Sequence, residues 1–169
     1  NLRVGYDLSP TQEIEARVAW WHDDSTVTNT TWLRDAAGNP VWSGLVKDGT
    51  RQFSVASNAF APSTRDEVHR QLGATWKTKH AKGWNASVVA TDYVIQSDAA
   101  RQANLAQPLA ELGGAGTVTR RDGTGWNTFE VQSTYTPTEG DFGNGRHALV
   151  LGLHRNQYKL QNVVNNAPD

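Results

Sequence analysis

The chain has 169 residues, of which 37% are hydrophobic, with 16 Lys or Arg, 17 Asp or Glu and a formal net charge of −1. A near-neutral chain without a basic tract gives no electrostatic reason to expect a nucleic-acid partner. Cysteine is absent, which excludes disulfides and thiolate chemistry, and no apolar run reaches the roughly 18 residues of a transmembrane helix.

Alternating polar and apolar residues begin at the start of the chain. Leu2, Val4 and Tyr6 alternate with polar or small neighbours, and after a turn at 9–12 the same alternation continues from residue 13 to 22. A period of two is typical of a strand with one apolar and one wet face. Because the chain opens in mid-strand without Met or a signal peptide, we expect it to be a fragment of a longer protein.

A long polar stretch, 23–66, follows. Within it, 28–34 and 41–45 are predicted to pair as a solvated hairpin. The His-Asp-Asp triplet at 22–24 carries ligand types that suit several divalent ions. No second histidine lies at ligand spacing, so a solvated cluster is favoured and no metal site is expected.

Regular alternation resumes at Glu67 and is clearest over 126–136, where Phe129, Val131 and Tyr135 fall on one face. A barrel strand needs about 9–11 residues to cross a bilayer, whereas the mean strand has about 5–6. Length therefore favours a membrane barrel over a soluble sandwich. The predicted strands span about 1–8, 13–22, 67–78, 84–95, 126–136 and 146–160.

The predicted connections alternate in length. Those at 9–12, 79–83 and 137–145 are short, and those at about 23–66 and 96–124 are long. Short turns on one side and long loops on the other are typical of outer-membrane barrels. The chain is therefore predicted to be all-β: one antiparallel up-and-down meander over 1–169 that forms a curved, open-sheet slice of a transmembrane β-barrel.

Aromatic residues fall into two groups. Trp32 and Trp42 lie in the first long stretch and, with Arg120 and Arg121 in the second, are the candidates for ligand contact. The other group lies near predicted strand ends, where amphipathic rings suit the headgroup region. It consists of Trp20, Trp76, Trp84 and Trp126.

None of the sequence motifs supports a catalytic role. Glu13 and Glu15 share a strand face with Arg17, which favours a hydrated wall over an acid–base pair. The Gly-rich run at 113–116 lacks the strand and helix that flank a phosphate loop, and no nucleophile elbow occurs. We expect no catalytic residue, no cofactor and no enzyme activity.

Several segments together resemble TonB-dependent outer-membrane receptors. They are GYDLSPT at 5–11, DAAGNPVW at 35–42, GWNAS at 83–87, GWNTF at 125–129, GRHALVLGLH at 145–154 and YKL at 158–160. The resemblance implies a large barrel in the outer membrane of a Gram-negative bacterium, closed around a plug, that takes up a scarce ligand such as an iron chelate with energy from TonB. Neither a plug-like segment nor an energy-coupling box is found, so the resemblance implies an internal slice of the barrel.

Two readings of the apolar face remain open. In a barrel slice the face is continuous, outward and bordered by aromatics. In a soluble, secreted β-sandwich, for instance a glycan-binding module with Trp platforms, the face is buried against a second sheet. The two predictions differ in whether the chain itself supplies a second layer.

Overall fold

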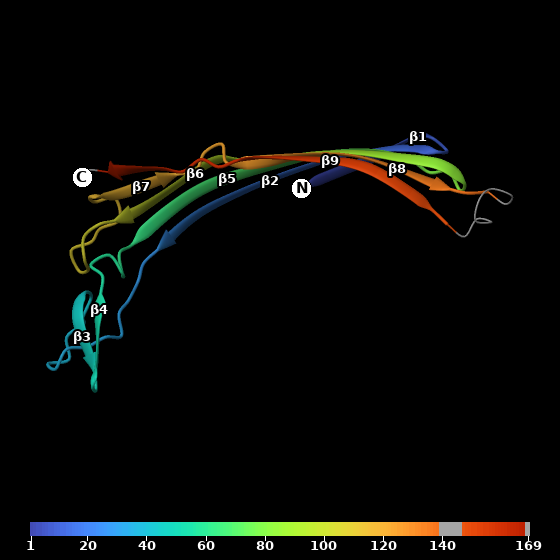
Figure 1. The fold of residues 1–169 in the computed structure, drawn as a ribbon. Helices are drawn as coiled ribbons and strands as arrows, with labels where there is room; N and C mark the ends of the chain where they lie inside the picture. Colours follow the sequence, from blue (N-terminus) through green and yellow to red (C-terminus); the bar gives the residue numbers. More distant parts are fainter. Residues whose placement is uncertain (139–146, 168–169) are drawn as a thin grey trace. The chain divides into compact units, whose positions relative to one another are not determined.

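A computed structural model of the chain describes residues 1–138 and 147–167, and all regular structure in them is antiparallel β-strand (Figure 1). The predicted all-β, antiparallel class is therefore confirmed, as an open sheet. The strands are β1 (Leu2–Ser9), β2 (Gln12–Val27), β3 (Gly44–Asp48), β4 (Arg51–Val55), β5 (Ser63–Thr78), β6 (Gly83–Ala103), β7 (Gly116–Arg120), β8 (Gly125–Thr136), β9 (Leu149–Lys159) and β10 (Val163–Ala167).

The chain forms two compact units, and strands β2, β5 and β6 run through both. The first unit comprises Asn1–Trp21, His69–Gln96 and Gly123–Leu160. Within it the strand order is β1-β2-β5-β6-β8-β9, so strands that follow one another in this unit lie side by side in the sheet. Figure 1 shows these strands edge on as a single layer.

Short turns in the first unit are closed by side chains. Asn85 accepts a hydrogen bond from the His80 backbone N–H at 2.6 Å and donates to the His80 carbonyl at 2.7 Å. Gly83 supplies the positive φ of +83° that the end of this turn needs. The amide of Lys79 donates to the Thr11 carbonyl at 2.8 Å and so ties the turn to the preceding β1–β2 connection.

Pairing register fixes which side chains share a face. Val131 of β8 lies opposite Val88 of β6 on one side and Leu153 of β9 on the other. Phe129 lies opposite Ala90 in the same way. Because directly opposite residues of an antiparallel pair point to the same face, the apolar rows predicted from alternation fall on one face of the sheet.

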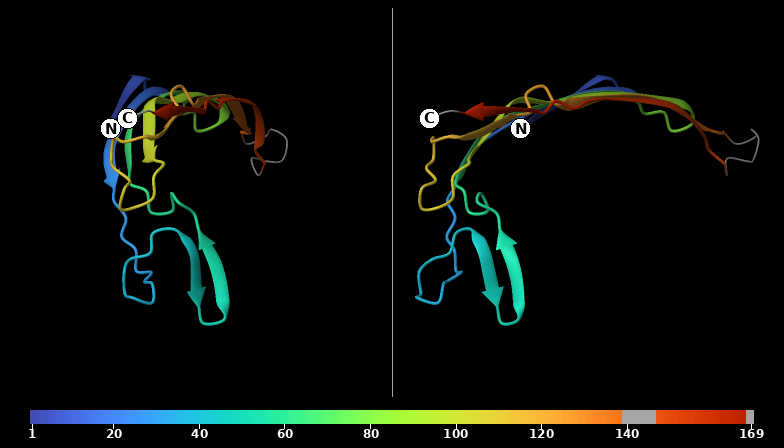
Figure 2. Two further views of the ribbon diagram at one scale, coloured as in Figure 1. Left: turned by 90° about the vertical axis from the view of Figure 1, so that its left-hand side faces the viewer. Right: turned by 60° about the vertical axis from the view of Figure 1, so that its left-hand side comes forward.

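The second unit comprises His22–Val68, Ser97–Asp122 and Gln161–Asp169. It contains the hairpin β3–β4, drawn in cyan in Figure 2, in which Val46 pairs with Phe53. The predicted hairpin between 28–34 and 41–45 does not form a ladder: an isolated bridge joins Arg34 to Pro40, the Val41 amide donates to the Leu33 carbonyl at 3.0 Å, and residues 44–45 pair with β4 instead. The Asp48-Gly49 turn, with a φ of +58° at Gly49, determines the hairpin instead.

The predicted loop at 96–124 is also partly wrong. β6 continues to Ala103 and pairs there with β7, and β7 pairs in turn with β10. Neither β7 nor β10 was among the predicted strands. Hydrophobic alternation is weak here because backbone pairing and charged contacts hold these strands, not an apolar stripe. The predicted turn at 137–145 falls mostly outside the described residues, as does the predicted strand start at residue 146.

A close approach between β6 and β8 gives the first prediction. A Cβ added to Gly125 would lie 2.1 Å from the Tyr93 carbonyl oxygen, whereas one added to Gly5 would come no closer than 3.9 Å to the Ile14 oxygen. Gly125→Ala should therefore destabilise the folded protein by about 1–3 kcal/mol through overpacking. Urea titration of both variants measures this, with Gly5→Ala as the matched control; equal midpoints would contradict the register.

Candidate functional site

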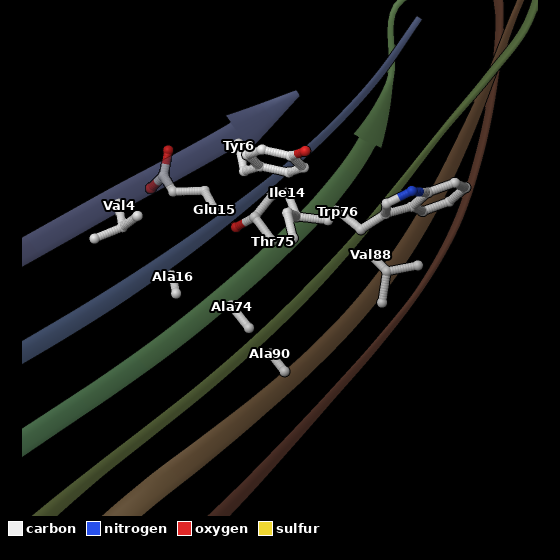
Figure 3. A pocket seen from close by; sticks show the side chains of 10 residues that line it. All are labelled: Val4, Tyr6, Ile14, Glu15, Ala16, Ala74, Thr75, Trp76, Val88 and Ala90. Atoms are coloured by element: carbon white, nitrogen blue, oxygen red, sulfur yellow. The ribbon is translucent and has the colours of Figure 1, made fainter. Parts of the chain in front are cut away.

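One face of the first unit is almost entirely apolar. On β1 and β2, Leu2 pairs with Val18, Val4 with Ala16 and Tyr6 with Ile14. Figure 3 shows how this face continues across β5 and β6, where Ala74, Trp76, Val88 and Ala90 line a shallow hollow of about 410 Å³ with the β1 and β2 residues. On β8 and β9 the face ends with Phe129, Val131, Tyr135, Leu149, Leu151 and Leu153, and Arg155 also lies on it, opposite Phe129.

This face lies open in the described structure. Tyr6 is 66% exposed and Leu153 is 80% exposed, at the two ends of the sheet. Large exposed apolar patches on proteins mark surfaces that another phase or molecule covers. We name the set of apolar side chains on this face the apolar band.

The apolar band has two different borders. Toward the short turns, rings gather: Trp84 and Tyr135 lie opposite each other, with ring centroids 5.0 Å apart. Toward the other end the same face becomes polar, with Arg70 bonded to Asp92 at 3.2 Å. Asp92 pairs with Asn127, and Asn127 pairs with Gln157, so this polar border crosses the strands in register.

No second layer covers the apolar band within residues 1–138 and 147–167. The buried hydrophobic residues in that part of the chain are Val46, Ala61, Ala103 and Ala110, all of the second unit. The accessible surface is 11648 Å² for an 18.5 kDa chain, whereas a folded monomer of that mass exposes about 8,200 Å². A sandwich core is therefore not formed by the described residues.

The opposite face of the first unit carries hydrated charge pairs. Arg3 pairs with Glu15, and Glu13 binds Lys79 and, at 3.6 Å, Lys77. On β8 and β9, Glu130 lies 3.1 Å from Nδ1 of His154. Exposed pairs of this kind contribute little stability each. These pairs place opposite charges beside one another on the polar face.

Trp20 lies on the same face as Val18 by strand alternation, and Trp76 and Trp84 also belong to the apolar band. Trp126 lies on the opposite face. Trp126 pairs with Tyr93 and with Tyr158 on the polar face. Parity along 126–136 could have revealed this, because Trp126 differs from Phe129 by an odd number of residues.

The second unit is organised around a buried carboxylate. Asp98 is fully buried, and Arg65 donates to both of its oxygens at 3.0 and 2.9 Å. Arg121 adds a third contact at 3.4 Å, and the Asp98 amide donates to Asp122 at 2.7 Å. Hydrogen bonds from Arg65, and the charges of Arg65 and Arg121, hold the pKa of the Asp98 carboxyl below its usual value.

The four nominated ligand residues all belong to the second unit, and they do not form one site. Trp32 is 89% exposed, and Trp42 packs edge to face on Phe60 with centroids 5.8 Å apart. Arg120 lies 3.6 Å from Asp122. Of the four residues, Arg121 is the one that lines a groove of about 480 Å³. Arg65 and Arg101 line the same groove.

The described ranges, 1–138 and 147–167, include the predicted His-Asp-Asp cluster. His22 of the predicted solvated cluster lies 3.3 Å from Asp66. Within those two ranges, no three His, Asp or Glu side chains are grouped to hold a metal ion. The same part of the chain has no helix with the length and apolarity needed to cross a membrane.

Comparison with known proteins adds no relative. No protein-family model matches the chain, and neither a curated protein nor a solved structure matches it.

The buried carboxylate gives a second prediction. Asp98→Asn removes a charge that pairs with Arg65 and Arg121, whereas Arg65 keeps its contact with Glu67. Because a hydrogen bond to a charged group contributes about 1.5–3 kcal/mol, amide hydrogen exchange in the paired residues of β6 and β7 should accelerate about tenfold or more. Asp66→Asn, which removes an exposed partner of His22, is the control and should change exchange less than about fivefold.

The same contact predicts a pH dependence. Because the pKa of Asp98 is lowered in the folded protein, its stabilisation is present above the unfolded value of about 3.9 and is lost as pH falls through the lowered pKa. The protection of the β7 amides, taken relative to the intrinsic exchange rate at each pH, should therefore fall in wild type below about pH 4. An Asp98→Asn variant with wild-type exchange at neutral pH would contradict the buried ion network.

Proposed function

We propose that the first unit is part of the wall of an outer-membrane β-barrel, with the apolar band against lipid and the polar face toward a water-filled interior. One observation carries this proposal: a single-layered sheet whose faces separate apolar from charged residues strand after strand. In a lipid bilayer such a sheet satisfies its backbone groups by pairing and its apolar side chains by acyl contact.

Strand length favours lipid over a soluble partner. β2 and β5 have 16 residues each, β6 has 21 and β8 has 12. A tilted barrel strand needs about 9–11 residues to cross the hydrocarbon core. The ring border formed by Trp84 and Tyr135 and the polar border at Arg70 and Asp92 delimit the apolar band, as interfaces delimit the outer surface of a barrel.

The proposed activity is that of the family that the sequence resembles. In this proposal the parent protein is a TonB-dependent receptor of a Gram-negative outer membrane, and it takes up a scarce small molecule such as an iron chelate with energy from TonB. The long connections of the chain face outward, where the ligand arrives. The segment supplies part of the barrel wall, and uptake is a property of the whole receptor.

A pair of neighbouring lysine substitutions tests the membrane assignment. Val131→Lys places a charge in the middle of the apolar band, which costs about 2–4 kcal/mol near the bilayer midplane. Gln132→Lys places the same charge on the polar face and should be nearly silent. Urea unfolding of the receptor that carries the segment, after folding into lipid vesicles, measures the difference.

The comparison isolates one variable because the two residues are adjacent and differ in the face they occupy. Wild-type folding with and without lipid is measured in parallel, since a soluble sandwich would also be harmed by Val131→Lys. Equal stability of the two variants in vesicles, or a sharp unfolding transition of the wild type in plain buffer, would refute the outer-membrane assignment.

A further inference from the structure

The polar face of the first unit holds a row of rings that the lipid contact does not explain. The rings of Trp21 and His69 have centroids 4.7 Å apart, those of His69 and Tyr93 are 5.6 Å apart, and those of Tyr93 and Trp126 are 4.0 Å apart. Trp126 also lies opposite Tyr158 on β9. Five neighbouring strands thus contribute one ring each, and we name this set the ring row.

The ring row is ordered and yet open to solvent. Nδ1 of His69 forms a short hydrogen bond with the Tyr93 hydroxyl, and the Tyr93 and Trp126 rings stack with an interplanar angle of 27°. Trp21 is 48% exposed, Trp126 41% and Tyr158 71%. A row that served packing alone would bury its rings, because exposed aromatic surface costs free energy in water.

Polar groups without net charge flank the ring row. The hydroxyls of Thr91 and Thr128, which pair across β6 and β8, are hydrogen bonded. Beside Trp21 and His69 lies a hollow of about 230 Å³ that is also lined by Gln71 and by Arg70, and Arg70 belongs to the polar border on the opposite face, where it pairs with Asp92. None of the five rings carries a permanent charge, so the site favours a neutral ligand over an anion.

We propose that the ring row binds a neutral oligosaccharide lying across the strands. Sugar rings present a face of C–H groups that stacks on aromatic rings, and a rim of hydroxyls that hydrogen bonds to amides and hydroxyls. Adjacent strands lie about 4.7–4.9 Å apart, which brings successive rings under successive parts of an extended ligand. The proposal deepens the proposed function, and rests on it for the position of the ring row inside the barrel.

Calorimetric titration of the detergent-folded protein carrying the segment tests this inference, with maltohexaose and cellohexaose as ligands. At least one sugar should bind at micromolar to millimolar concentration. Trp126→Ala and Trp21→Ala should each weaken that binding about tenfold or more, in line with the loss of one stacked ring. Trp126→Phe, which keeps a ring, should retain more affinity than Trp126→Ala.

Trp84→Ala is the matched control, because it removes a Trp from the apolar band at the other face of β6. It should leave the sugar affinity unchanged. Binding of neither sugar, binding of the planar probe benzamide in their place, or equal losses in Trp84→Ala and Trp126→Ala would each overturn the inference.

Failure of the inference and failure of the proposed function are separable. Lipid-dependent folding without any sugar binding overturns the oligosaccharide site and leaves the barrel assignment intact. Folding in plain buffer with sugar binding that depends on Trp126 overturns the barrel assignment and supports the ring row.

Discussion

Backbone pairing between antiparallel strands is the interaction on which the rest of this structure depends. In the first unit, pairs such as Val131 with Val88 and Val4 with Ala16 keep apolar side chains on one face from strand to strand. A slip of one residue would turn a whole strand over and place its charges among apolar neighbours. Close approaches such as Gly125 to the Tyr93 carbonyl depend on the same register.

Register also leaves a large apolar surface exposed. It gathers the apolar side chains into one band and the charge pairs into the opposite face, and residues 1–138 and 147–167 supply no second layer over the band. The second unit is stabilised differently, by a small cluster of buried alanines and by the contact between Arg65 and the buried Asp98. The alanines are Ala61, Ala103 and Ala110. The first unit thus leaves its apolar band exposed, whereas the second unit has a small core and buried polar contacts of its own.

Alternation was sufficient to predict the strands whose faces differ. The stretch 126–136 and the segments around Val4, Val18 and Val88 were placed correctly, and their shared face followed from parity. The same reasoning failed for the extension of β6 to Ala103 and for β7, where Arg65, Arg121 and Asp98 hold the structure through contacts distant in sequence. Periodicity carries no information about such contacts.

The candidate sites were predicted less well than the strands. Loop position suggested Trp32, Trp42, Arg120 and Arg121, but the structure gathers rings elsewhere, on the polar face around Tyr93 and Trp126. Each ring of that row is an ordinary aromatic in its own strand. The row arises from register across five strands, which the order of residues along one strand does not reveal.

Site-directed spin labelling along β6 tests the central assignment most directly, because the chain has no native cysteine to interfere. Single cysteines at each position from 84 to 91 are labelled in the protein folded into lipid vesicles, and collisions with oxygen and with a water-soluble nickel complex are compared. If the apolar band faces lipid, access alternates with a period of two: oxygen is favoured at Trp84, Ala86, Val88 and Ala90, and nickel is favoured at the positions between them. Nickel access equal at both sets of positions would contradict the central assignment.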